Sequence, residues 1–290
     1  MADIQDSASP LVSVVMATYR NDSLPFLKEA IDSVLNQTHT HLELIVATDG
    51  PVSEDAGHYL GSLASSEPRL RIHALPENKG PATARNAGIA QAHGEYVAIL
   101  DADDLAKPER IEKQLRFLVE NGYDAVGSCY DVLDSQGAVT RTKSVPSTPD
   151  EIRRWLCWLN PIGNSTVLAK AELLKKHPYS EAIHTSTVSF DGEDYALWVT
   201  LIKEGHTLAN QPESLVQFRE AENFIAKRKG WIPFRTDLET KLATLSLYPL
   251  YKRPLVIVAS LCTAAVRLMP SPVLAILYAL RNAFQFSGAK

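Results

Sequence analysis

The chain has 290 residues, of which 45% are hydrophobic and 22% are charged, and its formal net charge at pH 7 is −5. These ordinary globular values and the length predict one α/β domain with a C-terminal extension, and the negative charge argues against a nucleic acid partner. The three scattered cysteines give neither a disulfide framework nor a zinc spacing. The first ten residues show no basic region followed by an apolar stretch, so we expect no signal peptide and a cytoplasmic location.

Four short apolar runs in the first hundred residues predict β-strands, at 11–17, 42–48, 70–75 and 95–100. The segments between them have helical periodicity, most clearly at 24–36 and 81–92. This alternation predicts a parallel sheet whose ligands meet the carboxyl ends of the strands. Polar clusters follow three of the runs, at 18–20, 49–50 and 101–104.

The last of these clusters places Asp101, Asp103 and Asp104 directly after an apolar run. Carboxylates crowded at one strand end need a cation or a proton, and hard oxygen ligands suit Mg²⁺ or Mn²⁺, which would bridge a pyrophosphate. The alternative is a solvated acidic turn before the helix that begins near Pro108. The chain lacks both the GxGxxG and the GxxxxGK[ST] motifs, which argues against hydride transfer and P-loop phosphoryl transfer.

Three segments together resemble the donor half of the inverting family 2 glycosyltransferases, which have the GT-A fold. They read VSVVMATYR, SVLNQTHTHLELIVATDG and ENKGPATARNAGIAQAHGEYVAILDADDLAKPERIEKQ, and they cover residues 10–120 with their order and spacing intact. The resemblance implies a Rossmann-like, mostly parallel sheet flanked by helices, and a metal-dependent enzyme that uses a nucleotide sugar.

The resemblance also assigns roles in donor binding. Thr18 and Tyr19 match positions that hold the nucleotide, Asp49 matches an acid that hydrogen-bonds the base, and Arg85 matches a basic residue that closes on the nucleotide. The alternatives are a packed tyrosine ring, an Asx turn before a glycine, and a surface ion pair. Thr48 stands where many relatives have a further aspartate, so the identity of the base stays open.

The same matching places Asp101 near the ribose and the metal, and it favours Asp103 as the direct metal ligand. After a helix at 108–121, the chain predicts a strand–turn–strand unit and then a strand that enters a helix. The loop before that last strand contains Pro161, Gly163, Asn164 and Ser165, and in the resembling family it lies near the sugar.

Glu193 and Asp194 precede an amphipathic helix that Gly205 ends. In the resembling family this pattern is the general-base site, so Asp194 is the candidate base and Glu193 orients it or the acceptor. The alternative is that Asp194 only interacts with the helix dipole. Further on, Arg219 is expected to approach the donor phosphates, but Ala221 stands where many relatives have a histidine, so we expect no histidine metal ligand there.

We expect a catalytic domain at 1–220, with a donor half at 10–120 and an acceptor half at 121–220, and a helical extension at 221–290. Two apolar runs near the end are each too short to span a membrane, and cations lie close to them. They predict either contact with an anionic membrane surface through 252–286, on the inner face of the cytoplasmic membrane, or packing on the domain or on a second copy of the chain.

The resulting hypothesis is a non-processive, inverting hexosyltransferase that serves cell-surface polysaccharide assembly. It would move a sugar from UDP-hexose or dTDP-rhamnose to a hydroxyl of a glycan or lipid-linked glycan. One alternative is a sugar-nucleotide nucleotidyltransferase, although its Gly-rich, Arg-containing loop is missing after the first strand. The other is a non-catalytic nucleotide-sugar-binding or scaffold protein.

Overall fold

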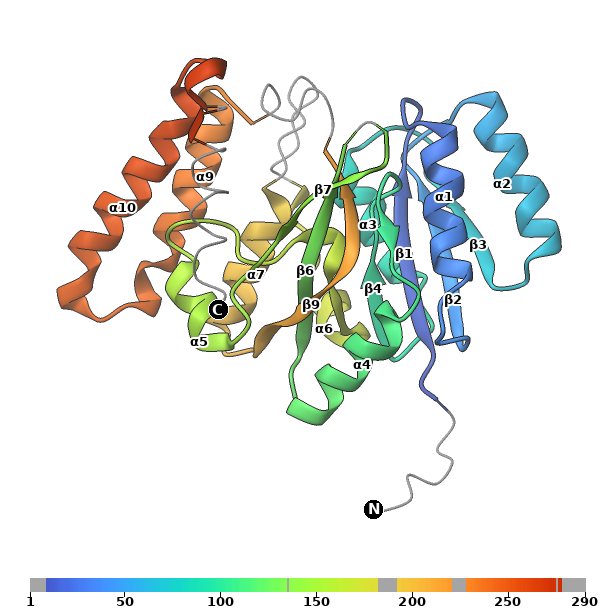
Figure 1. Ribbon diagram of the computed structural model, residues 1–290, viewed down its shortest axis with the longest axis horizontal. Helices are drawn as coiled ribbons and strands as arrows, with labels where there is room; N and C mark the ends of the chain where they lie inside the picture. The colour runs from blue at the N-terminus through green and yellow to red at the C-terminus, as the bar shows by residue number, and fades with distance from the viewer. Residues whose placement is uncertain (1–8, 135, 182–191, 221–227, 275, 278–290) are drawn as a thin grey trace.

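A computed structural model describes residues 9–134, 136–181, 192–220, 228–274 and 276–277. Its centre is a nine-stranded sheet flanked by helices (Figure 1). Eight strands follow the order β3-β2-β1-β4-β8-β6-β9-β5, and β7 pairs with β6. The bounds are β1 Val12–Thr18, β2 Leu42–Thr48, β3 Leu70–Ala74, β4 Tyr96–Ile99, β5 Leu105–Ala106, β6 Ala125–Leu133, β7 Val139–Lys143, β8 Leu168–Lys170 and β9 Leu208–Arg219.

The first four strands are parallel, as the apolar runs predict. The sheet then changes direction, because β8 is antiparallel to both β4 and β6, while β9 is parallel to β6. The predicted strand–turn–strand unit is the antiparallel pair β6 and β7. The carboxyl ends of β1, β2 and β4 therefore meet at one edge, where the predicted polar clusters lie.

Helices cover both faces of the sheet. Their bounds are α1 Leu24–Leu35, α2 Glu54–Ser66, α3 Pro81–Ala90, α4 Arg110–Asn121, α5 Pro149–Trp155, α6 Ala171–Lys176, α7 Glu193–Lys203, α9 Trp231–Ala243 and α10 Arg253–Ala265. Side chains of β1 alternate between the faces, so Val14 packs in a core with α1, α2 and α4, whereas Val15 packs in a core with α3, α6 and α7. This covering on both sides confirms the predicted α/β class.

Residues 228–274 form a helical unit at one side of the sheet (Figure 1). Helix α10 packs against α9, and α9 contacts α7. The sequence analysis missed α9, and most of the second predicted apolar helix lies outside the described residues. None of the helices in the described part of the chain combines the length and the hydropathy needed to cross a membrane.

Candidate active site

The loop after β1 carries Thr18 and Tyr19 at the edge where the parallel strands end. The Thr18 hydroxyl and the Tyr19 backbone N–H both donate to the Asp22 carboxylate, each at 3.0 Å. This acid fixes the turn and leaves the Tyr19 ring 39% exposed. Burial, followed by the charges of Asp22 and Asp103, raises the pKa of the Tyr19 phenol, so Tyr19 lies near the acidic cluster.

Asp49 is buried where β2 ends, and it holds the loop that leads into α3. Its two carboxylate oxygens accept from the backbone N–H groups of Lys79 at 2.7 Å and Gly80 at 2.9 Å. Gly50 completes the close approach: its φ is +78°, and a Cβ there would lie 2.6 Å from the Asn78 nitrogen. Asp49 therefore has a structural contact, and its hydrogen bond to a base stays a prediction.

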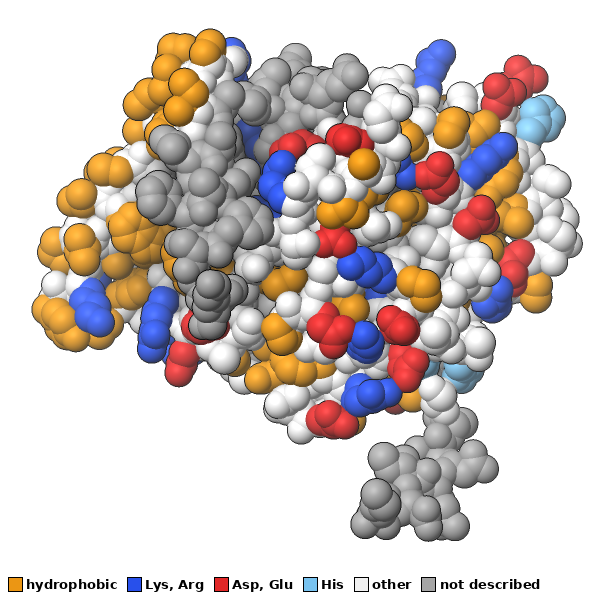
Figure 2. Space-filling model, viewed as in Figure 1, with side chains coloured by type: hydrophobic (Ala, Val, Ile, Leu, Met, Phe, Trp, Pro, Cys, Tyr) orange, Lys and Arg blue, Asp and Glu red, His pale blue; other side chains and the backbone are white. Residues whose placement is uncertain are grey.

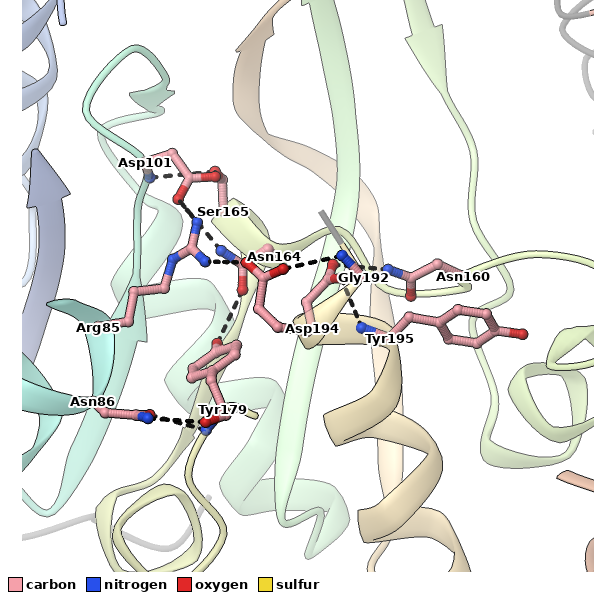
Figure 3. A network of polar contacts seen from close by, with 11 residues as sticks. Arg85, Asn86, Asp101, Asn160, Asn164, Ser165, Tyr179, Gly192, Asp194 and Tyr195 are labelled. Atoms are coloured by element: carbon pink, nitrogen blue, oxygen red, sulfur yellow. Dashed lines mark hydrogen bonds and ion pairs between the residues drawn. The ribbon is translucent and has the colours of Figure 1, made fainter. Parts of the chain in front are cut away.

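Arg85 joins the two predicted halves of the site (Figure 3). From α3, its guanidinium donates to Asp101, which follows β4, at 2.8 Å and to Glu193, the first residue of α7, at 2.6 Å. Arg85 is only 8% exposed, and its Cζ atom lies 5.7 Å from the centre of the Tyr179 ring. The ion pair therefore connects residues that are 108 positions apart in the sequence.

Asp101 is surrounded by donors from the loop before β8. Its carboxylate accepts from the Ser165 hydroxyl at 2.8 Å and from the Asn164 amide at 3.3 Å, in addition to Arg85. Burial raises the pKa of Asp101, but Arg85 and these hydrogen bonds outweigh it, and the net pKa lies below the usual 3.8. Asp101 is thus held as a carboxylate, and the loop before β8 lies against the acidic cluster.

The other two acids of the cluster differ sharply in environment. Asp103 is exposed, whereas Asp104 is fully buried and accepts from the Arg219 backbone N–H at 3.0 Å. Burial, with the charges of Asp103 and Asp101, raises the pKa of Asp104 well above its usual value. Behind the cluster, burial lowers the pKa of Arg110 to about 9, although the charges of Asp104 and Asp101 oppose this change.

These acids suit a hard divalent cation. Asp104 Oδ2 is buried without a hydrogen-bond partner among the described residues, and burial together with the charges of Asp103 and Asp101 raises the pKa of Asp104, so a nearby cation would stabilise its carboxylate. The oxygens of Asp101, Asp103 and Asp104 are not close enough together to bind one cation by themselves. Among the described residues, three ligand atoms come that close only in a group elsewhere in the molecule. This arrangement fits Mg²⁺ or Mn²⁺, which is commonly held by one or two carboxylates together with substrate phosphates.

At the start of α7, Glu193 and Asp194 have different partners. Glu193 is buried and paired with Arg85, whereas Asp194 is partly exposed and accepts from the Asn160 amide at 2.7 Å (Figure 3). The Tyr195 backbone N–H also donates to Asp194, at 2.6 Å. These two hydrogen bonds hold the Asp194 carboxylate in place at the start of α7, where it is compatible with accepting a proton.

Arg219 ends β9 beside the acidic cluster, but its side chain lies against α1. The guanidinium pairs with Glu29 and stacks over the Phe26 ring, with its Cζ atom 4.2 Å from the ring centre. A contact of Arg219 with donor phosphates stays a prediction and would require the guanidinium to leave Glu29.

The sequence analysis missed Asn160, Arg110 and Tyr179 as members of this network. Asn160 directly precedes the loop at 161–165, which the sequence analysis placed near the sugar, so extending that loop by one residue would have included it. Arg110 and Tyr179 gave no signal, because burial beside the acids is decided by packing between distant segments.

Comparisons of the sequence identify the family of the chain. Residues 13–177 match the model of the family described as glycosyl transferase family 2. An uncharacterized glycosyltransferase of Methanocaldococcus jannaschii is 30% identical over 224 residues, which are 76% of this chain and 75% of that protein. The amylovoran biosynthesis glycosyltransferase AmsE of Erwinia amylovora is 27% identical over 238 residues, 82% of this chain and 86% of AmsE.

Solved structures show the same fold at low sequence identity. Residues 1–349 of S. aureus TarS, in complex with UDP-GlcNAc, superpose with a TM-score of 0.67 at 16% identity, covering 95% of this chain and 78% of that one. The mannosyltransferase PcManGT of Pyrobaculum calidifontis, in complex with GDP-Man and Mn²⁺, gives 0.60 at 18% identity, covering 95% and 81%. The chain therefore belongs to glycosyl transferase family 2 and has the GT-A fold.

Proposed function

We propose that this glycosyltransferase is inverting and non-processive and transfers a hexose from a nucleoside diphosphate sugar to an acceptor hydroxyl. The observation that carries the proposal is the pairing of Arg85 with both Asp101 and Glu193, because it unites the acidic end of β4 with the acidic start of α7. Inversion by one displacement requires a donor-phosphate site and a base on opposite sides of the anomeric carbon, and these two clusters are the candidates.

The donor side would use the residues at the ends of the parallel strands. Thr18, Tyr19 and Asp49 would hold the nucleotide, and Asp103 would be the direct ligand of Mn²⁺ or Mg²⁺, with Asp101 beside it. When bound, the cation supplies charge neutralisation for the diphosphate leaving group. The complexes of TarS with UDP-GlcNAc and of PcManGT with GDP-Man and Mn²⁺ support a nucleotide sugar and a divalent cation as the classes of ligand.

The acceptor side would use Asp194 as general base. Asp194 takes the proton of the acceptor hydroxyl while that oxygen forms a bond to the anomeric carbon, and the bond from this carbon to the diphosphate oxygen breaks. Asn160 orients the carboxylate through its 2.7 Å hydrogen bond. Glu193 acts indirectly, because its bond to Arg85 fixes the start of α7.

We propose UDP-hexose or dTDP-rhamnose as the donor, and a glycan or lipid-linked glycan of cell-surface polysaccharide as the acceptor. The amylovoran enzyme AmsE supports this pathway class. The test is calorimetric titration with UDP, dTDP and GDP, each with Mn²⁺ and with EDTA, on the wild type and Asp103→Asn. We expect UDP or dTDP to bind in a metal-dependent manner, and Asp103→Asn to weaken this binding at least about tenfold.

Absence of binding to every nucleotide would overturn the proposed donor class and favour a scaffold role. If Asp103→Asn binds the nucleotide with Mn²⁺ as tightly as the wild type does, Asp103 is not the metal ligand. Asp134→Asn, which changes an acid in the turn after β6, is the matched control and should bind as the wild type does.

The division into a catalytic part at 1–220 and an extension at 221–290 is also our proposal, with the extension contacting an anionic membrane surface. Apolar side chains gather over α10 (Figure 2), where Leu255 is 67% exposed and Val258 is 56% exposed. Lys252 and Arg253 begin this helix. An exposed apolar stripe beside cations is typical of a helix that lies in the membrane interface.

Flotation with phosphatidylglycerol vesicles tests this contact. We expect the double variant Leu255→Glu/Val258→Glu to lose at least about tenfold in the vesicle-bound fraction, because it places two charges in the apolar interface. Val119→Glu changes an equally exposed apolar residue on α4 and should bind vesicles as the wild type does. Wild-type flotation by the double variant would contradict the assignment and favour protein packing on this face.

A further inference from the structure

A second cluster of ligand-type side chains lies at the other end of α7 from Glu193 and Asp194. His177 follows α6, Glu204 follows α7, and His206 lies two residues further on, before β9. One ligand atom from each of the three residues lies within 4.8 Å of the others. Helix α7 has 11 residues, so about 16 Å separates this cluster from the proposed base.

His177 points an unsatisfied nitrogen into the cluster. Its side chain is 9% exposed, and its Nε2 atom is buried with no hydrogen-bond partner in the part of the chain that the structure describes. The nearest acid atom recorded for it is Glu204 Oε2, at 3.5 Å. A buried imidazole nitrogen without a hydrogen bond is costly, so this geometry favours a ligand between the two side chains.

A carboxylate lies beside one ring nitrogen of His206, on the side from which metal-bound histidines usually find a hydrogen-bond acceptor. Its Nδ1 atom lies 3.6 Å from Asp124 Oδ2, and Asp124 is itself fixed by Lys170 at 2.7 Å and by the Thr207 backbone N–H at 2.9 Å. A carboxylate that faces one ring nitrogen orients the imidazole and leaves the other nitrogen for a metal ion.

Two imidazoles and one carboxylate are a typical zinc ligand set, completed by a water molecule in tetrahedral sites. Bonds of about 2.0–2.2 Å place neighbouring tetrahedral ligands roughly 3.4 Å apart. The 3.5 Å between His177 and Glu204 already matches this spacing, and small side-chain rotations would bring in His206. Mg²⁺ prefers an all-oxygen set, so this cluster and the acidic cluster would select different ions.

We propose that His177, Glu204 and His206 bind one Zn²⁺ ion that ties the ends of α6 and α7 to the turn before β9. The site is separate from the donor site, and its role is to fix α7, whose other end carries Glu193 and Asp194. The carbonyl ends of two helices meet there, which favours a cation. The proposal is independent of the donor and of the reaction.

The test is zinc titration of the EDTA-dialysed protein in excess Mg²⁺, which occupies oxygen-ligand sites. We expect one tightly bound Zn²⁺ per chain and a rise in melting temperature. His177→Asn and His206→Asn should each weaken zinc affinity at least about 100-fold. His58→Asn is the matched control, because His58 also faces a glutamate, Glu54 at 3.8 Å, but on an exposed helix surface. It should bind zinc as the wild type does.

Two further variants separate a lost ligand from a lost fold. Glu204 is 47% exposed, so Glu204→Gln removes a ligand without opening the core, and it should also weaken zinc binding. Asp103→Asn should leave zinc binding unchanged, because the acidic cluster is a different site. The proposal fails if the wild type binds no stoichiometric zinc, or if the histidine variants and Glu204→Gln bind it as tightly as the wild type.

Discussion

The acids at the end of β4 and those at the start of α7 are arranged alike around Arg85, but their charges are balanced differently. In each region one carboxylate pairs with Arg85: Asp101 after β4 and Glu193 on α7. Each region also has a more exposed acid: Asp103 lies beside the buried Asp104, and Asp194 lies beside the buried Glu193. The two acids paired with Arg85 hold the two regions together, and Asp103 and Asp194 are the proposed metal ligand and general base.

The difference lies in the excess negative charge. The β4 end also contains the buried Asp104, whose pKa is raised by burial and by its two acidic neighbours. At α7, the open carboxylate of Asp194 is bonded to a neutral amide from Asn160. The acids at the end of β4 therefore favour a bound cation, whereas Asp194 is a carboxylate that can accept a proton.

The largest effect is expected from Arg85→Gln, which removes the residue shared by both regions. It leaves the buried Glu193 and the half-buried Asp101 without their cation, and loss of one partner from a buried ion pair costs about 3–5 kcal/mol. Urea denaturation measures this loss. Arg116→Gln breaks an exposed ion pair with Glu112 and should cost less than about 1 kcal/mol. Similar losses in the two variants would show that Arg85 does not anchor the site.

A smaller, pH-dependent effect is expected from Asp104→Asn in the absence of metal. Because the folded-state pKa of Asp104 is raised, its favourable contribution is present below the unfolded pKa and is lost as the pH rises through the folded pKa. The wild type should therefore lose stability as the pH rises above about 4, and Asp104→Asn should lose less. The melting temperature of Asp104→Asn should rise by about 2–4 °C relative to that of the wild type over this pH range.

Melting curves in EDTA from pH 5 to pH 9 measure this difference. Glu120→Gln, which changes an exposed acid of α4, is the control and should follow the wild-type profile. A constant offset between Asp104→Asn and the wild type at every pH would contradict the unbalanced charge at the β4 end.

The sequence predicted the β4 region better than the α7 region. The apolar runs determine β1 to β4, and parallel strands place their carboxyl ends together, so Asp49 and Asp101 could be assigned to one edge from local pattern. The partners of these acids could not be assigned. Whether Arg85 meets Glu193 depends on packing across 108 residues, and no local pattern encodes that contact.

The same limit applies to Arg219 and to the end of the chain. The family resemblance placed Arg219 near the donor phosphates, but the position of its side chain over Phe26 depends on how α1 packs beside it. Helix α9 was missed because the sequence analysis assigned apolar helices only to the two runs that follow it. Its buried Lys241–Asp237 pair, at 2.6 Å, shows that this helix packs through charged residues as well.

The most direct test of the separate roles of the two regions compares Asp103→Asn with Asp194→Asn in two assays. The first measures the affinity, with Mn²⁺, for the nucleotide that binds the wild type. The second measures the rate at which that nucleotide is released from its hexose donor. We expect Asp103→Asn to lose metal-dependent nucleotide binding. We expect Asp194→Asn to bind the nucleotide as the wild type does but to turn over at least about 100-fold more slowly. Wild-type turnover by Asp194→Asn, or wild-type metal-dependent binding by Asp103→Asn, would contradict the account.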